Sequence, residues 1–158
     1  MDRACEVSGK TINIMEVCGT HTVSIFRNGI RASIPPKLKL LSGPGCPVCV
    51  TDQKYIDNVL ELAERDDCIL ATYGDMIRVP GNSGTLEKKN KDNIRIVLSS
   101  EDALNIAKEN PTKTIIFLAV GFETTTPATA VMIKEALEQD IKNLKILSGH
   151  KLVVPAMR

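Results

Sequence analysis

The sequence predicts an α/β fold, with three layers formed by helices on both sides of a mostly parallel sheet. Short runs of β-branched and apolar residues alternate along the 158 residues with stretches whose apolar residues recur at helical spacing. Strands that are separated by helices pair in parallel through right-handed crossovers. A chain with 43% hydrophobic and 25% charged residues is expected to bury a core.

Six strands and four helices follow from this alternation. The strands are expected at residues 11–17, 38–42, 68–73, 94–98, 114–120 and 144–147. The helices are expected at residues 52–65, 100–109 and 127–139, with a further one after His21. The helix at 52–65 has the clearest pattern, because its apolar residues fall on one face at i, i+3, i+4 and i+7. Serines favour the start of the helix at 100–109, and Pro127 suits the first turn of the helix at 127–139.

Composition argues against several classes of partner. Lys and Arg number 20 against 19 Asp and Glu, and the chain has no Trp and 3% aromatic residues. A nucleic-acid partner is therefore not expected, because single-stranded binders stack bases on aromatic side chains and basic patches hold phosphates. The first ten residues lack an apolar signal region, and no window has the roughly 20 apolar residues of a membrane span. We expect a cytoplasmic protein with no membrane partner.

Residues 43–49 place Cys46 and Cys49 in a C-x-x-C spacing within a loop fixed by glycine and proline. Two intervening residues let both sulfurs reach one metal ion or each other, and such motifs often lower a thiol pKa from about 8.5 towards 7. The prolines restrict the backbone and favour a preset sulfur geometry. The pair is expected to be a redox dithiol or half of a metal site.

A second cluster upstream holds Cys18 and His21 at the same two-residue gap. Together with the C-x-x-C pair it offers four potential metal ligands. Cys5 and Cys68 carry less weight: Cys68 begins an apolar run and is expected to be buried, while Cys5 lies near the start of the chain.

Four loops with unusual residues follow predicted strands. Residues 18–21 follow the first strand, residues 43–49 the second, residues 73–81 the third and residues 121–127 the fifth. In an open parallel sheet the carboxyl ends of all strands lie on one edge, which is where ligands bind. The sequence therefore predicts that the four loops converge on one rim and form a functional site.

The last two loops have both structural and chemical interpretations. Asp75 and Arg78 can form an ion pair that shapes their loop; alternatively, Asp75 can bond a thiol or a metal-bound group, and Arg78 can hold an anion. Glu123 and Thr124 precede a predicted helix, so the threonines are candidate caps, and the carboxylate could equally shuttle protons. No G-x-x-x-x-G-K-[ST], G-x-G-x-x-G or G-x-S-x-G motif supports nucleotide binding or a serine hydrolase.

At these residues the sequence resembles the HypD family, the scaffold proteins for maturation of nickel-iron hydrogenases. The matching stretches are MEVCGTHT at 15–22, GPGCPVC at 43–49, YGDMIRVPG at 73–81 and GFETTTP at 121–127. The resemblance implies that a HypC-like partner and this protein together hold iron while cyanide and carbon monoxide ligands are installed. It also implies a HypE-like cyanide donor and, indirectly, the hydrogenase large subunit as recipient.

By position, the resemblance implies that Cys18 binds the iron and that a cysteine of the HypC-like partner is the second sulfur ligand. It implies that Cys46 and Cys49 are a redox-active pair. The candidate catalytic residues are Cys46, Cys49, His21, Asp75 and Glu123. The candidate cofactor-binding residues are Gly43, Gly45, Arg78 and Thr124.

Length is the one departure from the family. Its members run further and carry a C-terminal cysteine cluster that binds a four-iron four-sulfur centre, whose ligands are absent from this chain. We therefore expect residues 1–158 to be the N-terminal α/β region of a HypD-like protein, with one complete lobe and part of a second.

Three hypotheses of function remain open at this point. The first is a maturation scaffold with a redox-thiol step rather than a turnover enzyme. The second is a stand-alone thiol-disulfide oxidoreductase in which Cys46 attacks and Cys49 resolves. The third is a structural zinc module that uses Cys18, His21, Cys46 and Cys49.

Overall fold

The computed structural model describes residues 9–89 and 92–158, and Cys5 lies outside them. The chain divides into two units. Unit 1 comprises Met1–Val50 and Val154–Arg158, and unit 2 comprises Thr51–Val153, so the chain passes between the units twice. Among the described residues, no helix has the length and apolar character needed to cross a bilayer.

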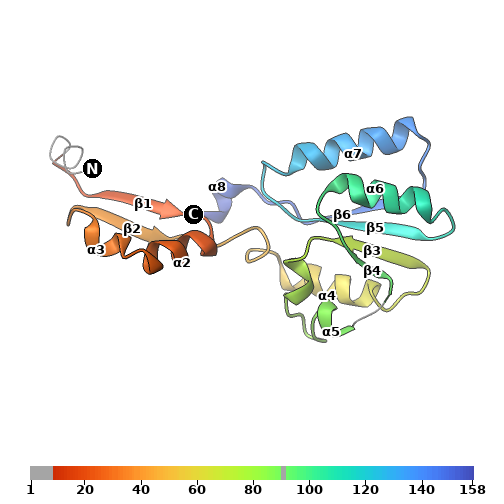
Figure 1. Cartoon of the computed structure of the whole chain (residues 1–158), viewed down its shortest axis with the longest axis horizontal. Helices are drawn as coiled ribbons and strands as arrows, with labels where there is room; N and C mark the ends of the chain where they lie inside the picture. Colours follow the sequence, from red (N-terminus) through yellow and green to blue (C-terminus); the bar gives the residue numbers. More distant parts are fainter. Residues whose placement is uncertain (1–8, 90–91) are drawn as a thin grey trace. The chain divides into compact units, whose positions relative to one another are not determined.

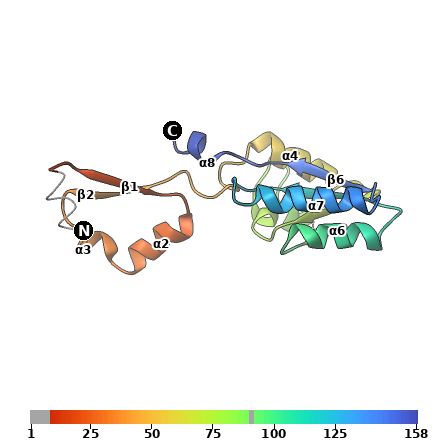
Figure 2. The same cartoon turned by 90° about the horizontal axis from the view of Figure 1, so that it is seen from above.

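Unit 2 contains a four-stranded parallel sheet with the strand order β4-β3-β5-β6. Its strands are β3 (Cys68–Thr72), β4 (Ile94–Ile96), β5 (Thr114–Ala119) and β6 (Leu144–Ser148). Its helices are α4 (Gln53–Leu62), α5 (Leu86–Lys89), α6 (Ser100–Glu109) and α7 (Thr126–Glu138), with a 3-10 turn, η1, at Met76–Arg78. The two views place α4 and α6 on opposite sides of this sheet (Figures 1 and 2).

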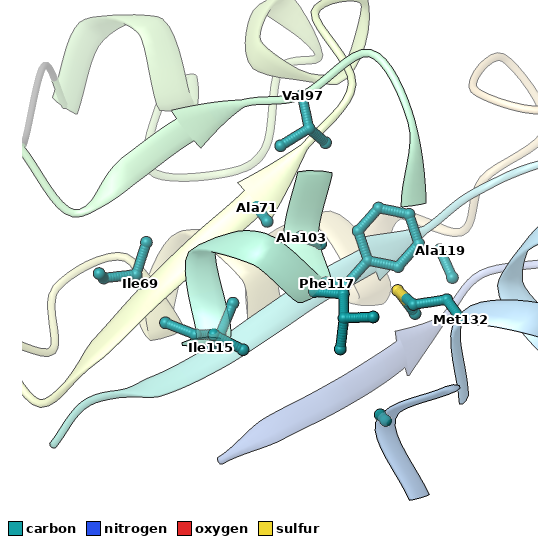
Figure 3. Close-up of a cluster of buried hydrophobic side chains, with 11 residues drawn as sticks. Ile69, Ala71, Val97, Ala103, Ile115, Phe117, Ala119 and Met132 are labelled. Carbon is teal, nitrogen blue, oxygen red and sulfur yellow. The ribbon is translucent and has the colours of Figure 1, made fainter. Parts of the chain in front are cut away.

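The core of unit 2 follows from the alternation of side chains along its two central strands. Ile69, Ala71, Ile115 and Phe117 point to the face covered by α6 and α7, where they pack with Met132 (Figure 3). The alternate residues point to the face covered by α4. The Cys68 thiol lies on that face and donates to the carbonyl of Leu62 at 3.4 Å. Both faces of the sheet are covered, so β3 is buried along its whole length.

Unit 1 has a smaller parallel ladder. It pairs β1 (Ile12–Glu16) with β2 (Leu38–Ser42), and the crossover between them holds α2 (Gly19–Arg27) and α3 (Ile30–Ser33). Figure 2 views this pair nearly edge-on and shows both helices on one side of it. A short helix, α8 (Val153–Ala156), ends the chain. Leu38 is the one buried hydrophobic residue among those that the structure describes in this unit.

The prediction of an α/β fold with parallel strands is confirmed, and each predicted strand is present within two residues at each end. The prediction of one sheet is wrong. The strands form two separate sheets because β1 and β2 pair only with each other. The alternation of strand and helix patterns identifies the strands and their connections, but it does not specify which strands lie next to each other in a sheet. The assignment of residues 1–158 to one region of a longer protein stays a prediction.

The structure adds α3, α5, α8 and η1, which the sequence pattern did not predict. Each is no longer than four residues, too short to show helical periodicity. The predicted helix at 100–109 is confirmed with its start signal. Ser99 accepts a hydrogen bond from the Asp102 N–H at 3.2 Å, and Asp102 accepts one from the Ser99 N–H at 2.9 Å, which makes a capping box.

Replacing Ser99 tests the contribution of this cap to unit 2. We expect Ser99→Ala to lower the free energy of unfolding by about 1 kcal/mol, because the Asp102 N–H loses its acceptor. Ser99→Thr keeps the hydroxyl and is the matched control. Urea unfolding followed by circular dichroism measures both; equal midpoints for the wild type and Ser99→Ala would show that the cap contributes nothing.

Candidate functional site

The C-x-x-C pair lies in the turn that follows β2 in unit 1. The Cys49 N–H donates to the Cys46 carbonyl at 2.9 Å, which closes the turn, and the two sulfurs lie 3.3 Å apart as free thiols. Cys49 is exposed and Cys46 is partly buried. Burial raises the pKa of the Cys46 thiol, and the neighbouring Cys49 side chain adds to this effect. The expectation that the motif lowers a thiol pKa is therefore wrong for Cys46, because burial disfavours the charged form.

Two glycines fix the path of this turn. Gly45 has φ +99°, and a Cβ at this position would lie 2.8 Å from Cys49 Cβ and 3.1 Å from its sulfur. At Gly43 a Cβ would collide with the backbone carbonyl of Glu16, at the end of β1. Both candidate cofactor-binding glycines thus have a structural role here: one lets the turn lie against β1, and the other leaves room for the Cys49 thiol.

Cys18 lies between β1 and α2, at the residue that precedes the first helical turn. The main-chain N–H of Thr20 is the largest influence on its pKa, followed by the Thr20 hydroxyl, and both lower it; the N–H of His21 adds to this, and burial opposes it. The sulfur forms no capping hydrogen bond of standard geometry. The lowered pKa follows from donors at the start of the helix, chiefly the main-chain N–H and the hydroxyl of Thr20, which stabilise a thiolate.

Glu16 is the site residue that the sequence reasoning missed. It ends β1, two residues before Cys18, and its carboxylate accepts a hydrogen bond from the Thr22 hydroxyl of α2. That bond is the largest cause of a lowered Glu16 pKa, and the Ser42 side chain and the Arg31 charge lower it further. The sequence feature that could have identified Glu16 is a carboxylate at the end of a predicted strand, two residues before a candidate site cysteine.

His21 is exposed in the first turn of α2, where its N–H donates to the Cys18 carbonyl at 2.7 Å. Within residues 9–89 and 92–158, no three His, Cys, Asp or Glu side chains are grouped so that they could hold one metal ion. The four-ligand set that the sequence suggested, Cys18, His21, Cys46 and Cys49, is therefore not assembled.

The loop at residues 73–81 follows β3 in unit 2, not in the unit that holds the three cysteines. The expected ion pair between Asp75 and Arg78 is wrong: the Arg78 guanidinium contacts Glu87 at 3.2 Å instead. Asp75 is exposed beside η1, and its charge is a secondary cause, after burial, of a raised pKa of Tyr73.

The end of this third loop is held to α4 by a carboxylate. Asp57 accepts hydrogen bonds from the backbone N–H and the side-chain amide of Asn82, each at 2.7 Å. A Cβ at Gly81 would lie 2.4 Å from a Leu60 methyl group, so only glycine allows this close approach. The loop after β3 is thus fixed by packing as well as by hydrogen bonds.

The loop at residues 121–127 follows β5, at the same sheet edge as the loop after β3. Both oxygens of Glu123 accept from the Val153 N–H, at 3.1 and 3.0 Å. Thr124 is exposed, and Thr125 occupies the cap position of α7 without a side-chain capping bond, because its hydroxyl donates to the Phe122 carbonyl at 2.9 Å. Glu123 therefore ties this loop to the segment after β6.

The predicted convergence of four loops on one rim is thus replaced by two pairs. The loops with Cys18 and with Cys46 and Cys49 follow neighbouring strands of the unit 1 ladder. The loops with Asp75, Arg78, Glu123 and Thr124 follow neighbouring strands of the unit 2 sheet. Each pair lies at the carboxyl edge of its own sheet, as parallel pairing requires.

The fold and these loops define a class of α/β protein in which a reduced C-x-x-C pair and a separate cysteine of lowered pKa follow paired parallel strands. The chain belongs to the HypD family. The family model, described as "HypD: Hydrogenase formation hypA family", matches residues 2–158.

Individual relatives agree with this assignment. The chain is 45% identical over 152 residues to hydrogenase maturation factor HypD2 of Bradyrhizobium diazoefficiens, covering 94% of this chain and 40% of that protein. It is 41% identical over 151 residues to the HypD maturation factor of Escherichia coli K12, with the same coverage, and 40% identical over 159 residues to that of Rhodobacter capsulatus, covering 99% and 42%. The chain thus spans about two fifths of these relatives' length.

The contrast between the thiols predicts an order of reactivity. We expect Cys18 to be alkylated by iodoacetamide at lower pH than Cys46, because only thiolates react and the two pKa values shift in opposite directions. Cys68, 1% exposed, should stay unmodified in the native protein. Peptide mapping by mass spectrometry across a pH series measures this, with denatured protein as control. A later onset for Cys18 than for Cys46 would contradict the described environments.

Gly45→Ala tests whether the turn controls the thiol pair. We expect a shift in the Cys46–Cys49 reduction potential on the order of 30 mV, which corresponds to about 1.4 kcal/mol, since the added methyl group presses on Cys49. Gly29→Ala is the matched control, because Gly29 also has positive φ but no atom within 4 Å of the added Cβ. Equal potentials in both variants and the wild type would exclude this steric role.

Proposed function

We propose that this chain is part of a scaffold that assembles the iron-cyanide-carbonyl group of nickel-iron hydrogenases. The relatives at 40–45% identity are named as hydrogenase maturation factors. The observation that carries the proposal is the pairing of β1 with β2, because it sets Cys18 and the C-x-x-C pair on two loops at one edge of one ladder. Iron is the cargo of this scaffold.

Cys18 is the proposed iron ligand. Its lowered pKa favours the thiolate, the form that binds metals, and soft thiolates suit iron that carries strong-field ligands. Since the described residues offer no group of three ligands, the remaining coordination positions fall to the cyanide and carbon monoxide ligands and to a cysteine of a HypC-like partner. A HypE-like protein would supply the cyanide, and the hydrogenase large subunit would receive the finished group.

Cys46 and Cys49 are the proposed electron source. Closing their disulfide would release two protons to solvent and pass two electrons to the assembly of the iron's ligands. The 3.3 Å separation of the sulfurs requires only a small movement for bond formation. Restoring the dithiol needs an external reductant, for which the family resemblance suggests an iron-sulfur centre of the longer relatives. His21, beside Cys18 in unit 1, is a proposed proton-handling residue.

In unit 2, Asp75 and Glu123 are proposed for proton handling, and Arg78 and Thr124 for anion binding.

Metal analysis tests the assignment of Cys18. The chain would be co-expressed with a HypC-like partner and purified without oxygen. We expect Cys18→Ser to lower bound iron about tenfold or more, because the metal loses a protein ligand, while Cys46→Ser keeps iron. Infrared bands of bound cyanide and carbon monoxide should accompany the iron in the wild type and be lost in Cys18→Ser.

The control for this experiment is Cys68→Ala, which removes a buried thiol between β3 and α4 and should leave iron unchanged. Equal iron in the wild type and in Cys18→Ser would overturn the assignment. Loss of iron in all three cysteine variants would indicate a shared structural effect and would also count against it.

A thiol-disulfide oxidoreductase is the second candidate function, and the contact between Cys46 and Cys49 favours it. It requires the chain to reduce or oxidise a disulfide substrate without metal. Turnover of insulin disulfides that depends on Cys46 and Cys49 but not on Cys18 would support this candidate over the scaffold. The zinc module gains no support, since its four ligands are not assembled in the described residues.

A further inference from the structure

The carboxylate of Glu16 lies where the two cysteine loops separate. Glu16 and Ser42 are the last register pair of the β1–β2 ladder, so no strand pairing holds the chains together beyond them. The Cys18 loop continues from Glu16, and the turn with Cys46 and Cys49 continues from Ser42. Any further link between the two loops must therefore come from side chains or from non-strand backbone.

Glu16 makes such a link with its side chain. Its Oε1 accepts a hydrogen bond from the Thr22 hydroxyl in α2. Thr22 follows Cys18 by four residues, and the Thr22 N–H donates to the Cys18 carbonyl at 3.1 Å. Glu16 thus joins two parts of the site: its carboxylate contacts the turn of α2 that follows Cys18, and its backbone pairs in the ladder with Ser42, from which the C-x-x-C loop continues.

The backbone of Glu16 contributes to the same junction. Gly43, directly after Ser42, passes so close to the Glu16 carbonyl that a Cβ would lie 2.0 Å from its oxygen. The second carboxylate oxygen, Oε2, is buried without a hydrogen bond of standard geometry.

We infer that Glu16 is a positioning residue that sets the placement of the Cys18 thiol relative to Cys46 and Cys49. The inference rests on the proposed function for its biological meaning, but not for its geometry. The carboxylate holds the start of α2 to the end of β1, which the ladder pairs with the end of β2, so the two cysteine loops leave the ladder in a fixed relation. An iron ligand and its electron source must keep such a relation if electrons are to pass between them.

Cross-linking measures this relation without iron. The 158-residue chain would carry Cys5→Ser and Cys46→Ser, so that Cys18 and the exposed Cys49 are the two accessible thiols among the described cysteines. Bismaleimidoethane joins thiols that come close together. Alkylation by N-ethylmaleimide, followed on the Cys18 peptide by mass spectrometry, reports the reactivity of the Cys18 thiol by itself. The ratio of the two rates gives the effective concentration of one loop at the other, corrected for any change in thiol reactivity.

Three changes at the junction have different expected effects on this ratio. Glu16→Ala removes the link, and we expect a fall of about tenfold, as for loss of a constraint on an intramolecular reaction. Glu16→Gln keeps a carbonyl acceptor for Thr22 and should stay within about threefold of the wild type. Thr22→Val should lower the ratio when Glu16 is present and have no further effect in Glu16→Ala, because both changes break the same link.

Glu138→Ala is the matched control, since Glu138 makes one exposed ion pair with Lys134 in unit 2. An unchanged ratio in Glu16→Ala, an equal fall in Glu138→Ala, or an effect of Thr22→Val that is the same with and without Glu16 would each overturn the inference. Thr22→Val keeps the test decisive if Glu16→Ala does not fold. Failure of iron binding with the expected cross-linking pattern would count against the proposed function alone, and the reverse result against Glu16 alone.

Discussion

Parallel pairing of β1 with β2 is the constraint on which the placement of all three site thiols depends. Since both strands run in the same direction, the loops that follow them leave from one edge of the ladder. The ladder ends at Glu16 and Ser42. Beyond it, the loops are held by the close approach of Gly43 to the Glu16 backbone carbonyl and by the hydrogen bond from Thr22 to the Glu16 carboxylate. The placement of Cys18 and the C-x-x-C pair thus depends on the last pairs of one two-stranded ladder and on the contacts just beyond them.

Local sequence patterns predicted the positions of the strands and of the longer helices. Apolar runs located the strands, and Ser99 and Asp102 marked the start of α6, because these signals act within one element. Which strands share a sheet depends on contacts far apart in the chain, and for this reason the single-sheet prediction failed at β1 and β2. Spacing alone singled out Cys18, Cys46 and Cys49, and the family resemblance added their expected roles. The Arg78–Glu87 pair and the contact of Glu16 needed coordinates, because both depend on how a loop turns.

The thiols show that a motif alone does not set reactivity. Cys46 lies in the C-x-x-C motif, yet burial raises its pKa, whereas Cys18 lies outside any dithiol motif and has a lowered pKa because backbone N–H groups face it. The difference is in line with the functions proposed for them, since a more acidic thiol is more readily the thiolate that binds metals. Environment, rather than spacing, separates the two thiols.

The small core of unit 1 has a consequence for dynamics. Unit 2 buries strands on both faces, but the ladder that carries the cysteines has Leu38 as its one buried hydrophobic residue among those described, and it leaves Phe26 63% exposed. Segments with few buried contacts open at low free energy, so backbone amides of β1 and β2 should exchange hydrogen with solvent sooner than those of β3 and β5. The loops that carry the thiols therefore belong to the unit whose conformation a binding protein could change with the smaller cost in free energy.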